Sequence, residues 1–212
     1  MTGEPNWQII EGIEEDHMIA DSASTPAPAR PADRPDSALI VIDVQNGVMA
    51  ESWKAPEVID TISGLVDRAR DAGTEVVWVR HSSDEMPVDS PQWQIVDALA
   101  PADGEAIVEK THGNTFEETD FEDVLASRDI GHLVVTGAQS DACVRSTIHG
   151  GFSRGYDVTL VSDAHTTEDL TAWGAPEPEM VVSHTNLYWG FESGPGRTAA
   201  VKESADIDFG TR

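Results

Sequence analysis

The chain has 212 residues, of which 39% are hydrophobic and 25% are charged, as is typical of one well-buried globular domain. Its formal net charge is −26, from 39 acidic and 13 basic residues, so at low salt its surface would repel DNA, RNA and anionic membranes. Two explanations of this charge remain open: adaptation to a high-salt cytoplasm, or an ordinary acidic protein.

Membrane insertion and secretion are not expected. No apolar run reaches the roughly 18 residues that a membrane-spanning helix needs. Residues 1–7 lack the basic and apolar regions of a secretory signal. The expected location is therefore cytoplasmic, and neither nucleic acid nor a membrane is an expected partner.

The first 37 residues differ from the rest. The stretch Ser22–Pro31 is rich in proline and small residues, which is the composition of an extended linker. Residues 7–19 carry some apolar side chains, which either dock on the body or a partner subunit, or stay disordered. We expect an N-terminal extension and Pro/Ala-rich linker over residues 1–37 and one domain over residues 38–212.

From residue 38 onward, apolar runs of strand length alternate with helical patterns. The expected strands are 38–42, 75–79, 106–109, 132–136, 157–161 and 198–201. The expected helices are 56–72, 121–127, 143–153 and 179–191. Continuous apolar runs such as Ala38–Ile42 indicate strands that are buried on both faces. The alternation predicts a three-layer, Rossmann-like α/β fold: a six-stranded parallel sheet flanked by helices, with the active site at the carboxyl ends of its strands.

Two motif matches fail on their context. Residues 151–155 match the G-x-S-x-G nucleophile elbow, but Ser153 closes an expected helix instead of following a strand. Residues 194–199 match a loose dinucleotide fingerprint, but no βαβ unit follows them, so they are expected to form a turn.

Three residues with chemical potential follow expected strands. Asp43 ends the first strand, Lys110 ends the third, and Cys143 comes after the fourth. Each has an ordinary alternative: Asp43 could cap a turn, Lys110 could be solvated, and a lone cysteine is often a small buried hydrophobe. Because parallel strands deliver their carboxyl ends to one edge, we expect the three side chains to meet there.

Cys143 is the only cysteine, which excludes a disulfide within the chain and any multi-cysteine metal site. We expect it at the start of a helix, where the helix dipole lowers the pKa of a thiol and free backbone N–H groups can hold an oxyanion. A thiolate could then attack a carbonyl, while a carboxylate moves the proton and a cation steadies both charges. The sequence therefore predicts a nucleophilic cysteine site.

Several segments resemble one family along most of the body, from Ala38 to Phe209. They are Val41–Asn46, Glu109–Lys110 with Asn114–Phe116, Gly137–Val144, Gly155–Val158 and Asp163–Ala164. In these segments the chain resembles the isochorismatase-like cysteine hydrolases, which include nicotinamidases, carbamoyl-amide hydrolases and streptothricin hydrolase.

The resemblance implies a function and a set of site residues. The catalytic triad would be Asp43, Lys110 and Cys143. A cis peptide would precede Gln139, and the amides of Gln139 and Cys143 would form the oxyanion hole. The family also implies a homo-oligomer, either a dimer or a tetramer.

Departures from the family narrow the expected reaction. Nicotinamidases of this family carry an Asp-x-His…His metal set after the second strand, whereas here His81 has no second histidine before His112. One histidine cannot build that site, so neither a metal nor another cofactor is expected and nicotinamide becomes a poor candidate substrate. Members that cleave the vinyl ether of isochorismate lack the cysteine. Cys143 therefore favours cleavage of a C–N bond in an amide, ureide or lactam through a thioester.

The substrate pocket is less defined by the sequence. The candidate substrate-binding residues are Gln45, Trp93, His112, Phe116 and Tyr188. Core packing or an oligomer contact is the alternative for each aromatic residue, and Phe116 is favoured because its loop follows Lys110. His165 fits substrate binding and local hydrogen bonding equally. The rival function is a non-catalytic or redox-sensing protein in which Cys143 is oxidised.

Overall fold

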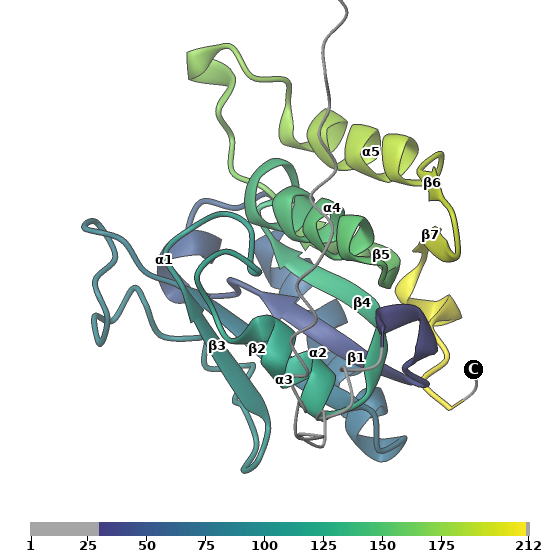
Figure 1. Cartoon of the computed structure of the whole chain (residues 1–212). Coiled ribbons are helices and arrows are strands. Elements are labelled where there is room, and N and C mark those ends of the chain that lie inside the picture. Colours follow the sequence, from purple (N-terminus) through teal and green to yellow (C-terminus); the bar gives the residue numbers. More distant parts are fainter. Residues whose placement is uncertain (1–29, 211–212) are drawn as a thin grey trace, which may run out of the picture.

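One mixed sheet forms the centre of the computed structural model, which describes residues 30–210. The strands lie in the order β3-β2-β1-β4-β5-β7-β6 (Figure 1). Their bounds are β1 Asp36–Ile42, β2 Glu75–His81, β3 Ala106–Lys110, β4 Ile130–Ala138, β5 Asp157–Thr166, β6 Ser193–Gly194 and β7 Arg197–Lys202. Every pairing between β1, β2, β3, β4, β5 and β7 is parallel, so the predicted parallel sheet is confirmed. The two-residue β6 adds an antiparallel edge.

Helices cover both faces of this sheet (Figure 1). Their bounds are α1 Asn46–Met49, α2 Ala55–Asp71, α3 Phe121–Ser127, α4 Arg145–Arg154 and α5 Pro178–Trp189. The buried stripe of α2, which includes Ile62 and Leu65, packs on one face. Residues of α3, α4 and α5 pack on the other. The molecule thus has the three layers that the alternating sequence pattern predicts.

The apolar run of β1 supplies both layers of the core. Ala38, Ile40 and Ile42 belong to the cluster on the α3–α5 side, whereas Leu39 and Val41 belong to the cluster on the α2 side. All five are at most 1% exposed. Burial of such a side chain contributes about 1.5–3 kcal/mol, which fixes β1 as a central strand and brings its carboxyl end to the middle of the sheet edge.

The strand order changes direction between β1 and β4. The chain runs from β1 outward to β2 and β3, and then returns to the other side of β1. The segments after β1 and β4 therefore leave in different directions, and a crevice opens at the carboxyl ends of such strands. Gly137 lets the two strands approach here, because its φ is +114° and a Cβ would lie 2.0 Å from the Ile42 carbonyl oxygen.

The body begins before Ala38. Strand β1 starts at Asp36, and Arg34 is only 4% exposed and donates a hydrogen bond of 2.7 Å to the Tyr156 hydroxyl. Residues 1–29, which hold most of the expected extension and linker, lie outside the described residues. The same is true of residues 211–212.

Both rejected motifs lie where the sequence places them. Ser153 is in the last turn of α4, and its hydroxyl donates to the His149 carbonyl oxygen at 2.7 Å. Residues 194–199 include the end of β6, the turn after it and the start of β7, which together belong to an antiparallel hairpin. Neither segment follows a strand into a helix, so neither has the geometry of its motif.

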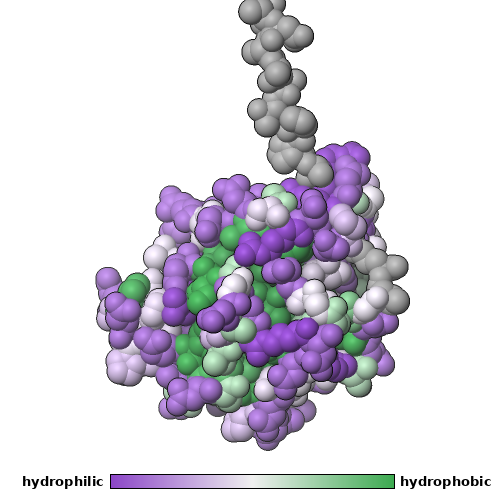
Figure 2. Space-filling model, turned by 90° about the horizontal axis from the view of Figure 1, so that it is seen from below, coloured by the Kyte–Doolittle hydropathy of each residue, from purple (hydrophilic) through white to green (hydrophobic). Residues whose placement is uncertain are grey.

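The face of the molecule seen from below is mostly hydrophilic (Figure 2). Figure 2 shows polar residues over most of the face seen from below, with hydrophobic ones gathered near its centre. No helix among residues 30–210 is long and apolar enough to cross a membrane.

Candidate active site

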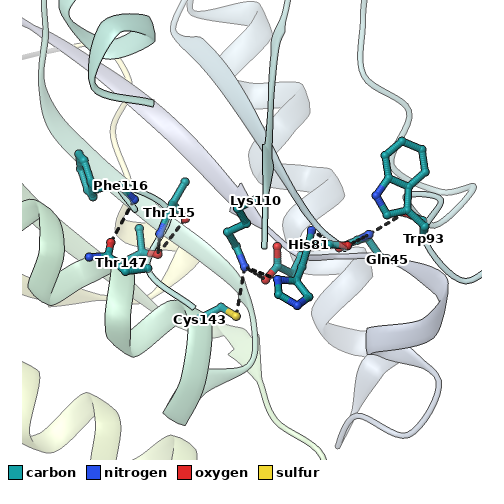
Figure 3. A network of polar contacts seen from close by, with 10 residues as sticks. Gln45, His81, Trp93, Lys110, Thr115, Phe116, Cys143 and Thr147 are labelled. Carbon is teal, nitrogen blue, oxygen red and sulfur yellow. Dashed lines mark hydrogen bonds and ion pairs between the residues drawn. The ribbon is translucent and has the colours of Figure 1, made fainter. Parts of the chain in front are cut away.

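The ends of β1, β3 and β4 bring three reactive side chains together. Lys110 Nζ donates to Asp43 Oδ2 at 2.6 Å and to Cys143 Sγ at 3.2 Å. Figure 3 shows the Lys110 amine between the Cys143 sulfur and the His81 ring. The side chains of Asp43 and Lys110 are 2% and 0% exposed. The structure thus gathers the three residues that the sequence pattern placed at one edge.

His81 belongs to the same cluster, although its sequence context indicates only a lone candidate metal ligand. It is the last residue of β2, it pairs in register with Lys110 of β3, and its Nδ1 lies 3.3 Å from Lys110 Nζ. Burial, with the charge of Lys110, lowers the pKa of His81, so the neutral ring can accept this hydrogen bond at pH 7. The Lys110 ammonium therefore has three acceptors for its three N–H groups.

Asp43 has one oxygen held and one free. Its backbone lies in the left-handed region with a φ of 52°, just beyond the end of β1. Oδ2 accepts from Lys110, whereas Oδ1 is buried with no hydrogen-bond partner among the described residues. Burial raises the pKa of Asp43, against the opposing effect of Lys110. An orphaned buried acceptor costs about 1–3 kcal/mol, and such oxygens often mark a group that acts on a ligand.

The pKa of the Cys143 thiol differs from the sequence-based expectation. Burial, followed by the negative charge of Asp43, raises this pKa to about 12, while Lys110 lowers it only in part. The prediction that a helix start would lower it is therefore wrong for the resting site. At neutral pH the sulfur keeps its proton, so a nucleophilic attack needs a base that removes the proton as the new bond forms.

Alkylation tests this protonated state directly. We expect iodoacetamide to modify Cys143 at pH 8 more slowly than it modifies free cysteine, because less of the thiol is ionised. The rate should rise with pH up to at least pH 10. Peptide mass spectrometry measures the adduct on the one peptide that contains cysteine, and the Cys143→Ala variant reports alkylation of other side chains. A fast rate that is constant from pH 6 to pH 9 would show a preformed thiolate instead.

The segment between β4 and α4 is an irregular turn. The peptide bond between Ala138 and Gln139 is cis, as the family resemblance implies. The Gln139 carbonyl oxygen accepts from the amides of Ala142 and Val144, at 3.0 and 3.1 Å. Cys143 lies between these donors in a π-helical turn, Ser140–Val144, and α4 begins only at Arg145. The predicted start of the regular helix at Cys143 was therefore two residues too early.

A buried chain of hydrogen bonds supports this turn from behind. The Ser140 hydroxyl lies 2.7 Å from His165 Nδ1, and His165 Nε2 lies 3.0 Å from the side-chain oxygen Oδ1 of Asn186. His165 is 1% exposed, and burial lowers its pKa. Of the two roles left open for His165, the structure shows local hydrogen bonding, which ties the turn to β5 and α5.

A cavity of about 460 Å³ adjoins these groups. It opens between the turn after β4, the residues after β1 and the long segment that joins β2 to β3. It is lined by Asp43, Gly47, Val48, His81, Ser83, Glu85, Met86, Gln92, Ala138, Gln139, Ala142, Cys143 and Glu168.

None of the five predicted substrate-binding residues lines this cavity. Gln45 is fully buried and joins two backbone segments. Its Nε2 donates to the backbone carbonyl oxygens of His81 and Trp93. Its Oε1 accepts from the backbone amide of His81. Trp93 is 5% exposed, and the Arg80 guanidinium stacks 3.7 Å from its ring centre.

The other three predicted residues lie elsewhere. Phe116 packs in the core, with its ring centre 4.7 Å from that of Phe121. Figure 3 shows its ring apart from the Lys110–Cys143 contact. His112 is exposed and lies 3.3 Å from Glu118. Tyr188 lines a separate cavity of about 350 Å³ beside α5. Closeness to a strand end along the chain does not determine which way a side chain turns, and here these side chains turn away.

No metal-ligand set is present in this part of the chain. Within residues 30–210, no group of three His, Cys, Asp or Glu side chains could hold a metal ion. The residues described at this site therefore do not supply the Asp-x-His…His set that nicotinamidases use for a metal.

A family model agrees with this architecture. The isochorismatase domain model matches residues 37–175, which is more than half of the chain. The protein belongs to the isochorismatase family.

The curated proteins with similar sequences carry the names of different hydrolases. A streptothricin hydrolase from Streptomyces noursei is 34% identical over 157 residues, which cover 71% of this chain and 62% of the relative. An N-carbamoylsarcosine amidase from an Arthrobacter species is 33% identical over 132 residues, which cover 61% of this chain and 50% of the relative. The matches thus span only 62% and 50% of these relatives' lengths. Among solved structures, an isochorismatase from Pseudomonas putida KT2440 matches with a TM-score of 0.70 and 26% identity, over 86% of this chain and 93% of that one.

Proposed function

We propose that this protein is a metal-independent cysteine amidohydrolase that cleaves a C–N bond of a small amide, ureide or lactam. The observation that carries the proposal is the shared ammonium: Lys110 holds both Asp43 and Cys143 beside a cavity, and leaves Asp43 Oδ1 free. The names of the relatives support a reaction of this class, since they include an amidase that acts on a carbamoyl compound.

In the first half of the reaction, Asp43 acts as a general base. Its free oxygen takes the thiol proton while the sulfur of Cys143 attacks the carbonyl carbon, and the carbonyl electron pair moves onto oxygen. The backbone amides of Gln139 and Cys143 hold this oxyanion. When the intermediate collapses, the C–N bond breaks and Asp43 gives its proton to the leaving nitrogen. A thioester on Cys143 remains.

In the second half, water completes the cycle. Asp43 removes a proton from a water molecule that attacks the thioester carbonyl, and the C–S bond breaks as the acid leaves. The sulfur then takes the proton back from Asp43. Lys110 stays protonated throughout and stabilises whichever of Asp43 and Cys143 carries the negative charge, which is the role of a cation in such a triad.

The redox-sensing alternative is less well supported by the site. Peroxide reacts with a thiolate, and sensor cysteines are exposed and have a low pKa. Cys143 is only partly exposed, and its pKa is raised to about 12. A thiol in this state suits attack that is assisted by a base better than it suits oxidation.

A substrate screen with detection of the intermediate tests the proposal. Release of ammonia or amine is measured over a panel of small amides, ureides and lactams, and rapidly quenched samples are analysed by peptide mass spectrometry. We expect turnover of at least one compound and an acyl adduct on the peptide that contains Cys143. A sulfenic acid on Cys143 after peroxide treatment, with no turnover over the whole panel, would favour the redox alternative.

Two further expectations stay predictions. They are the cytoplasmic location and a homo-oligomeric state, as a dimer or tetramer. Sedimentation velocity of the full chain at two salt concentrations measures the oligomeric state, and the high negative charge makes the salt series informative.

A further inference from the structure

The cavity beside Cys143 carries an excess of negative charge. Its lining includes the acidic residues Glu85 and Glu168 in addition to Asp43. The charge of Asp43 is matched by Lys110 at 2.6 Å, but Lys110 is buried behind it. His81, whose pKa is lowered, adds no positive charge at pH 7. Glu85 and Glu168 are therefore not balanced by any other group that lines the cavity.

The cavity also offers no cation to a bound ligand. None of its lining residues is a lysine or an arginine. On the neighbouring strands, Lys110 is committed to Asp43 and Cys143, and Arg80 is committed to Glu109 and to the ring of Trp93. A ligand carboxylate in this cavity would lose water and gain no ionic partner, which is unfavourable.

The remaining wall has the opposite character. Val48, Met86 and Ala138 present apolar groups, and Met86 is 9% exposed. Hydrocarbon on a ligand can cover this surface while a charged end stays near the carboxylates at the exposed side. Asp43 Oδ1, which is buried beside the same space without a hydrogen-bond partner among the described residues, is the acceptor nearest to the amide nitrogen of a ligand held against Cys143.

We infer that the substrate is a cationic amide, with an ammonium or guanidinium group joined by a short apolar segment to the carbonyl that Cys143 attacks. This rests on the proposed function and specifies the substrate class of the same site. Glu85 and Glu168 are the residues that select the charge. Glu85 is exposed and Glu168 is partly exposed, so water screens both charges, and each should contribute about a 2- to 5-fold preference and the pair about tenfold.

A matched set of substrates tests the inference. Three amides of equal length, ending in an ammonium, a hydroxyl or a carboxylate group, are compared by kcat/KM at low salt and at 0.5 M salt. We expect the ammonium compound to be preferred over the hydroxyl compound by about tenfold at low salt, and less at high salt. We expect the carboxylate compound to be the poorest of the three.

Charge-neutral variants assign the preference to the two carboxylates. In the double variant Glu85→Gln/Glu168→Gln, the ratio of kcat/KM for the ammonium compound to kcat/KM for the hydroxyl compound should fall to about one. The control Glu57→Gln removes the same charge from an exposed position on α2 that does not line the cavity, and should leave the ratio unchanged. A preference for the carboxylate compound, or a ratio that the double variant does not change, would overturn the inference.

Binding separates this inference from the proposed function. Calorimetry with the Cys143→Ala variant measures the affinity of the three compounds without turnover. If no amide is hydrolysed by the unaltered protein but the ammonium compound binds in a way that depends on Glu85 and Glu168, the proposed reaction fails and the charge selection holds. If none of the three compounds binds, the inference fails.

Discussion

We expect Cys143→Ala to lower kcat by at least about 10³-fold. The same change should alter the free energy of unfolding by less than about 1 kcal/mol. The large kinetic effect follows because no other cysteine exists to carry the acyl group. The small effect on stability follows because Cys143 is only partly buried and its sulfur accepts one hydrogen bond, from Lys110.

Cys143→Ser provides the matched control. A serine hydroxyl keeps the hydrogen-bonding capacity and nearly the same volume, but it is a much weaker nucleophile in this setting. Both variants should be inactive on the compound found by the screen, and both should unfold in urea near the midpoint of the unaltered protein. Near-normal turnover by either variant would exclude a thioester on Cys143.

The second large effect concerns the buried ion pair. Lys110→Met should reduce the free energy of unfolding by about 3 kcal/mol at pH 8, because it leaves the Asp43 carboxylate buried without its cation. In this variant Asp43 has a pKa far above its unfolded value, so stability is lost as pH rises between the two values, and the deficit should be smaller at pH 5. Activity should fall at least about 100-fold.

A double variant separates the charge from the packing. In Asp43→Asn/Lys110→Met both charges are removed while the shapes are nearly kept, so most of the lost stability should return, although activity should not. Urea titrations at pH 5 and pH 8 measure all four members of the cycle. A double variant as unstable as Lys110→Met would show that packing of the lysine stem, and not the unpaired carboxylate, causes the loss.

Much of the fold follows from local sequence patterns. The continuous apolar run at 38–42 predicts a buried strand, and the apolar residues at helical spacing from Val58 to Ala69 predict a helix with one buried face. These segments are close to the observed β1 and α2. The strand-end positions of Asp43 and Lys110 could be predicted for the same reason, since the polar residue marks where the buried strand ends.

Features that depend on tertiary pairing could not be predicted in this way. Strand β5 extends to Thr166 because His165 and Thr166 pair with Gly137 and Ala138, although the sequence there is polar. His81 joins the site because β2 lies between β1 and β3, which only the strand order reveals. The raised pKa of Cys143 likewise depends on burial and on the distance from Asp43, and neither can be read from spacing along the chain.

The aromatic candidates show a further limit. Phe116 follows Lys110 by six residues, yet it packs against Phe121 in the core below the site. An aromatic side chain gains free energy from burial in either place, so its chemistry does not distinguish a pocket from a core. Which of the two it enters is decided by the path of the loop.

The long segment between β2 and β3 contributes to the wall of the cavity but supplies none of the three reacting side chains. Its residues Ser83, Glu85, Met86 and Gln92 line the cavity, whereas Asp43 and Cys143 come from other parts of the chain. The segment is fastened by backbone contacts, including the hydrogen bond from the Gly47 amide to the Gln92 carbonyl oxygen. Because these fastenings do not depend on the side chains at 83–86, that stretch can diverge while the reacting groups keep their places. Substrate recognition can thus change, by evolution or by engineering, through residues 83–86 while the reacting groups stay the same.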